Sequence, residues 1–77
     1  MNIVPLCHLS CGQTGAVHAL HMGGSMRRRL LDLGLVSGTP VECLMTGPHG
    51  ALAAYSIRGA VIAIRRRDAE NIWVETL

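Results

Sequence analysis

The sequence contains no phenylalanine and no lysine, and its only aromatic residues are one tryptophan and one tyrosine. A core built from this chain must therefore be aliphatic. The hydrophobic fraction of 49% is ample for folding, which excludes a disordered chain, because disorder goes with low hydrophobicity and high net charge. With 77 residues, the chain is predicted to form one domain, residues 1–77, with a thin core.

Long apolar runs are also missing. No stretch approaches the ~20 apolar residues that a membrane-spanning helix needs, and the N-terminus lacks the basic leader and apolar centre of a signal peptide. The three cysteines are an odd number, which does not suggest a disulfide framework and fits a reducing compartment. We therefore expect a cytoplasmic protein without direct membrane insertion.

The residues needed for catalysis or nucleic-acid binding are scarce. No carboxylates are paired at a useful spacing, no glycine-rich phosphate loop is present, and Ser25 and Ser37 have no base placed by the sequence. Binding a nucleic-acid strand needs stacking aromatics, and Tyr55 and Trp73 are the whole supply. The net charge of +2 is also small. We predict a protein that is not an enzyme and binds no nucleic acid.

The clearest local pattern lies in Ser25–Gly38. Met26, Leu30 and Leu33 recur at helical spacing and predict an apolar stripe. Ser25 is predicted to cap the start of this helix. A helix of roughly two to three turns is not stable alone in water, so it must pack on another element.

Gly34 is predicted to end the helix, because glycine adopts the left-handed conformation without a Cβ penalty. If Gly34 is the C′ residue, Leu35 packs back on Leu30, as in a Schellman motif. The residues that we expect to be largely buried are Leu30, Leu33, Leu35, Val41, Ile57, Ile64 and Ile72.

Short extended segments separated by turns make up the rest of the chain. The predicted strands are Ile3–Leu9, Gly15–Leu20, Val41–Thr46, Leu52–Ile57, Val61–Arg65 and Ile72–Val74. Alternation within the third strand places Val41, Cys43 and Met45 on one side. Arg66–Asn71 is predicted to form a single helical turn. This pattern predicts a mainly β protein with one short helix, a small barrel of about five to six short strands with the helix across its open end.

Arginines occur in two clusters, Arg27–Arg29 and Arg65–Arg67, which allow a local positive patch. The first cluster lies at a helix start, where the helix dipole disfavours cations. Two interpretations remain open: a solvated face whose arginine stems cover apolar surface, or a surface for an acidic partner, since guanidinium groups bind carboxylates well. We predict partner contacts by Arg27, Arg28, Arg29 and, in the hairpin loop Gly47–Gly50, by Pro48 and His49.

The segment Cys7-His8-Leu9-Ser10-Cys11 holds candidate metal ligands. Cys7, His8 and Cys11 are side chains that suit zinc or ferrous iron. A closed zinc site needs about four ligands, so His18, His21, Cys43 or His49 would have to complete it. The alternative is that the thiols are small hydrophobic residues, and on this interpretation no cofactor is required.

Several motifs, in this order along almost the whole chain, resemble those of the FeoA family: Leu9, Gly12-Gln13, Gly15–Val17, Arg28–Val41, Ile57–Gly59, Ile62–Arg65 and Asp68–Val74. The segment Cys7–Cys11 departs from that pattern, because family openings usually have ordinary polar or proline residues there.

The resemblance implies an SH3-like β-barrel with a helix across it, a fold related to the C-terminal domain of DtxR-type metal-dependent repressors. It further implies a non-catalytic accessory protein of bacterial ferrous iron uptake. The expected partner is the FeoB membrane transporter, which carries a cytoplasmic GTPase domain. The alternative function is a metal sensor that binds zinc or ferrous iron through Cys7, Cys11 and nearby histidines. We expect any self-association to be weak.

Overall fold

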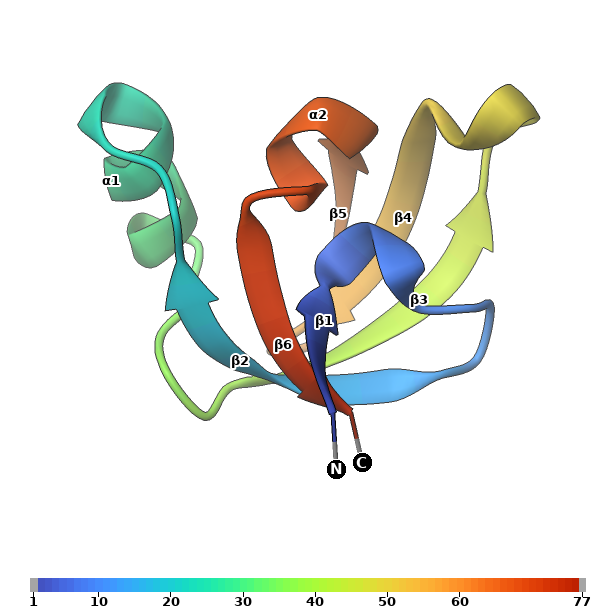
Figure 1. Cartoon of the computed structure of the whole chain (residues 1–77), viewed down its shortest axis with the longest axis horizontal. Coiled ribbons are helices and arrows are strands. Elements are labelled where there is room, and N and C mark those ends of the chain that lie inside the picture. The colour runs from blue at the N-terminus through green and yellow to red at the C-terminus, as the bar shows by residue number, and fades with distance from the viewer. Residues whose placement is uncertain (1, 77) are drawn as a thin grey trace.

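The computed structural model describes residues 2–76, which form a small barrel (Figure 1). One antiparallel sheet has the strand order β1-β6-β2-β3-β4-β5. Figure 1 shows the strands curving around a common centre, with the helices along one rim and both termini at the other. The bounds are β1 (Ile3–Pro5), β2 (Thr14–Leu20), β3 (Pro40–Thr46), β4 (Leu52–Ile57), β5 (Ala60–Arg65) and β6 (Ile72–Thr76). The predicted mainly β, SH3-like barrel is thus confirmed.

Four short helical segments connect the strands. They are the 3-10 turns η1 (Leu6–His8) and η2 (Pro48–Gly50) and the α-helices α1 (Gly24–Asp32) and α2 (Arg66–Ala69). The predicted strand Ile3–Leu9 is wrong beyond β1, because the chain turns into η1 after Pro5, burying Leu6. The other predicted strands agree with the observed ones to within two residues.

The predicted N-cap of α1 is wrong. Gly23 is the N-cap, and Ser25 lies inside the first turn. Gly24 has a φ of +68°, a conformation that glycine adopts without strain. The chain therefore turns into the helix before it reaches Ser25.

The C-terminus of α1 is the Schellman motif that the sequence predicts. Gly34 has a φ of +100°, and its N–H donates to the carbonyl of Leu31 at 3.0 Å. The N–H of Leu35 donates to the carbonyl of Leu30, also at 3.0 Å. Both Leu30 and Leu35 are buried, so this cap also fastens the helix to the core.

The core is aliphatic except for Cys43 and Tyr55, and Tyr55 is its largest fully buried side chain. All but one of the predicted core residues are buried: Leu30, Leu35, Val41, Ile57, Ile64 and Ile72. Leu33 is the exception, with 38% of its surface exposed. It is the C-cap residue of α1, so its side chain lies at the rim of a groove instead of over the barrel.

A β-bulge in β3 overturns the predicted alternation of that strand. The pairing with β4 shifts register between Cys43 and Met45. Cys43 is buried opposite Tyr55, whereas Met45 is 63% exposed. An extra residue in one strand reverses the facing of the residues that follow it, so Met45 points away from the core.

Candidate partner-binding groove

Helix α1 is fastened to the barrel at few points. Leu30 is its only buried side chain, and Met26 packs against the same core as a partly buried residue. At the start of the helix, the Nη1 atom of Arg27 donates a hydrogen bond of 2.9 Å to the carbonyl of Leu20 at the end of β2. Held in this way, α1 leaves a groove between itself and β5.

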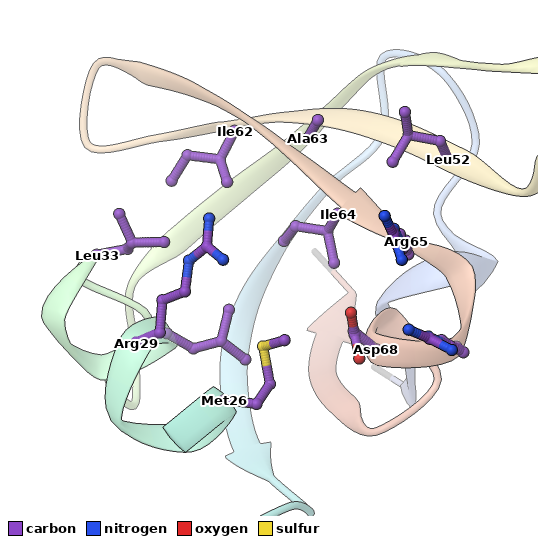
Figure 2. A pocket seen from close by; sticks show the side chains of 11 residues that line it. Met26, Arg29, Leu33, Leu52, Ile62, Ala63, Ile64, Arg65 and Asp68 are labelled. Atoms are coloured by element: carbon purple, nitrogen blue, oxygen red, sulfur yellow. The ribbon is translucent and has the colours of Figure 1, made fainter. Parts of the chain in front are cut away.

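The groove has a volume of about 420 Å³ and lies between α1, β5 and α2. Figure 2 shows Met26 and Leu33 on the helix side, with Ile62 and Ile64 facing them from β5. These four side chains, together with the buried Leu30, make its walls and floor apolar.

Arginines form the rim of this apolar groove. Arg29 extends from α1 toward β5 (Figure 2), while Arg65 and Arg67 line the other side. Asp68 is the only acidic residue that lines the groove. Among residues 2–76 the three arginines make no ion pair, so their charges are free to meet carboxylates of another molecule.

The three arginines of α1 that the sequence predicts as partner contacts have different surroundings. Arg27 is partly engaged by the carbonyl of Leu20. Arg28 is exposed and borders a shallow depression with Leu31 and Asp32, outside the groove. Arg29 alone of the predicted cluster lines the groove.

The predicted second contact, Pro48 and His49, lies in η2, beyond α2 as seen from α1 (Figure 1). His49 lies beside Arg65–Arg67 in a shallow surface depression that is separate from the groove. The second arginine cluster therefore connects the two predicted contacts. The sequence showed this cluster, but not that β5 and α2 place it opposite α1.

The predicted metal ligands have different surroundings. Cys7 is half-buried, and burial raises the pKa of its thiol, although the nearby Arg66 acts in the opposite direction. Cys11 is exposed, and its Sγ atom lies 3.6 Å from the carbonyl oxygen of Leu44. Burial also raises the pKa of the Cys43 thiol, and the neighbouring Cys11 contributes further.

The histidines do not complete a metal site with these thiols. His8 and His18 are exposed, and the ring of His21 lies 5.5 Å from that of Trp73. Residues 2–76 contain no group of three histidine, cysteine or acidic side chains placed to hold a metal ion. The structure therefore does not bring Cys7, His8 and Cys11 together as a three-ligand site.

These features define a class: a small SH3-like barrel with one surface helix and an arginine-rimmed groove beside it. Within residues 2–76, no helix has the length and apolar character that crossing a membrane requires. The FeoA domain model matches residues 4–76. The chain therefore belongs to the FeoA family, which takes part in ferrous iron transport.

Solved structures agree with this assignment. The chain is similar to the solution structure of the FeoA protein from Chlorobium tepidum, with 34% identity over 96% of this chain and 70% of that chain, and a TM-score of 0.90. It is similar to a crystal structure of an iron uptake regulatory protein (FeoA), with 27% identity over all of both chains and a TM-score of 0.86.

A third similar structure is Stenotrophomonas maltophilia FeoA complexed with zinc, described as a unique procaryotic SH3 domain protein. Identity is 26% over 91% of this chain and 87% of that chain, and the TM-score is 0.79. The comparison with curated proteins found no significant match.

Proposed function

We propose that this chain is a non-catalytic, cytoplasmic accessory protein of ferrous iron uptake that binds the cytoplasmic part of a FeoB-type transporter. The observation that carries the proposal is the groove between α1 and β5, with its apolar floor and arginine rim. Desolvated apolar pockets are where protein partners place anchoring side chains. Membership of a ferrous iron transport family supports the choice of partner.

The arginines of the rim determine which side chains a bound partner segment should carry. Arg29, Arg65 and Arg67 are planar, multi-donor cations without ion-pair partners among residues 2–76. Such groups favour carboxylates in two-point hydrogen bonding. We therefore expect a partner segment with an apolar side chain for the groove and acidic residues on either side of it. Arg27 and Arg28 on α1 and Pro48 and His49 in η2 remain proposed flanking contacts.

A binding titration with the transporter's cytoplasmic GTPase domain tests this proposal. Reversing two rim charges, Arg29→Glu with Arg67→Glu, should weaken binding at least tenfold, because like charges would face each other. The same variant should bind with a weaker dependence on salt. Both side chains are exposed, so thermal stability should change little.

The control is Arg58→Glu, a single charge reversal in an exposed turn outside the groove. Its affinity should stay within about twofold of the unchanged protein, since a distant surface charge is screened. If the rim variant binds as tightly as this control, the groove is not the docking site.

A further inference from the structure

The outward face of strands β3, β4 and β5 carries an ordered set of side chains. Cross-strand partners in an antiparallel pair point to the same side of a sheet, and the observed register places these outward residues in three rows. Along the sheet the rows are Glu42–Ser56–Val61, Met45–Ala54–Ala63 and Leu52–Arg65. We call these eight residues the outer sheet face.

The outer sheet face is apolar and uncovered. Val61 is 69% exposed, Met45 63% and Leu52 46%. Its centre consists of the small residues Ala54 and Ser56, so another protein surface can approach it closely. Single exposed apolar residues are ordinary, but a contiguous apolar patch marks an interaction site.

The only charged residues of this face are Glu42 and Arg65. They occupy opposite corners, because Glu42 is on β3 in the first row and Arg65 is on β5 in the last. Neither makes an ion pair among residues 2–76. An apolar centre with one negative and one positive corner is complementary to a copy of itself.

We propose that the outer sheet face binds the same face of a second copy of this chain. The twofold axis would lie between the faces, perpendicular to the line from Glu42 to Arg65. It sets Glu42 against Arg65 of the partner subunit, and Arg65 against Glu42 of the partner subunit. This is the reciprocal pattern that a twofold interface requires.

The same axis matches the remaining residues by size. Met45 meets Leu52 of the partner subunit, and Ser56 meets Ala63 of the partner subunit. Val61 and Ala54 each meet their own copy on the axis. The strands of the two sheets then cross at a steep angle, as in orthogonal sheet packing.

The area of the face predicts a weak dimer. Three strands about 4.8 Å apart and rows about 6.8 Å apart give a face on the order of 300 Å². Stable complexes bury about 800 Å² on each partner. Self-association is therefore expected to be weak, and the protein concentrations that test it run from about 20 μM to about 1 mM.

Sedimentation equilibrium of the full chain at low salt, over this concentration range, measures the association directly. Glu42→Arg alone, or Arg65→Glu alone, should weaken it about tenfold or more, because each places two like-charged pairs in the dimer. The double variant Glu42→Arg with Arg65→Glu restores opposite charges and should return to within about threefold of the unchanged protein. The control Arg67→Glu makes the same charge change on α2 and should have no effect.

Val61→Glu is an independent test, because it sets two carboxylates against each other on the axis while altering a well-exposed residue. It should abolish the dimer without lowering the melting temperature. A monomer at every concentration would overturn the proposal. A dimer whose association constant Glu42→Arg leaves unchanged would also overturn it, because that result is expected if the copies pair along the edge of β5. A double variant that does not regain the association of the unchanged protein would overturn it as well.

Discussion

Truncating Leu30 to alanine is expected to remove a large part of the folding free energy. Leu30 is 3% exposed and is the only buried side chain of α1. Cutting a buried leucine to alanine costs about 2–5 kcal/mol, through lost burial and the cavity left behind. Natural domains have about 0.05–0.15 kcal/mol of stability per residue, or roughly 4–12 kcal/mol for a chain of this length.

Urea unfolding followed by circular dichroism gives the free energy of unfolding for the variant and for a matched control. The control is Leu31→Ala, which removes the same atoms from the next residue of the helix, where 38% of the side chain is exposed. We expect Leu31→Ala to cost less than half as much. If Leu30→Ala lowers the free energy of unfolding by under about 0.5 kcal/mol, Leu30 does not anchor α1 to the core.

Three further outcomes are expected. Burial raises the pKa of Tyr55 to about 12, whereas an unfolded tyrosine titrates near ~10. The tyrosine therefore keeps its proton to higher pH in the folded state, and the free energy of unfolding should fall as the pH rises from ~10 toward ~12. An ultraviolet titration of this single tyrosine that gave the same midpoint in water and in urea would contradict this. Gly34→Ala should cost at least about 1–2 kcal/mol, because φ is +100° and the new Cβ would lie 2.6 Å from the Cδ of Arg58; an unchanged midpoint of urea unfolding would refute it. Replacing Cys7 and Cys11 together by serine should leave transporter binding unchanged and the melting temperature nearly so; loss of a stoichiometric metal, measured by mass spectrometry, would instead favour a metal site.

The sequence predicts the features that local rules decide. The end of α1 follows from one glycine and two leucines within six residues, and the structure contains that motif. Hairpin turns and β-branched runs likewise locate the strands, since each depends on neighbouring residues. The start of α1 differs from the predicted one because two adjacent glycines, Gly23 and Gly24, permit a turn into the helix that serine capping rules do not describe.

Features that depend on pairing between distant segments were not predictable in this way. The bulge after Cys43 changes which side of β3 faces the core, and alternation alone predicts the opposite for Met45. The groove is a second case, because Arg29 and Arg67 are far apart in the sequence and meet only once β5 and α2 are placed. The sequence contains both arginine clusters, but it does not indicate that they share one groove.

Strand β5 connects the two proposed surfaces. Its residues Ile62 and Ile64 line the groove, whereas Val61 belongs to the outer sheet face alone. Ala63 and, on β4, Leu52 belong to the outer sheet face and line the groove as well. Arg65 contributes to both, since it lines the groove and forms the positive corner of the outer sheet face. A guanidinium group that is held by Glu42 of the partner subunit is not available to a carboxylate in the groove. Self-association and transporter binding would therefore oppose each other through the residues that the two surfaces share, of which Arg65 is the charged one. By linkage each would weaken the other by the same factor.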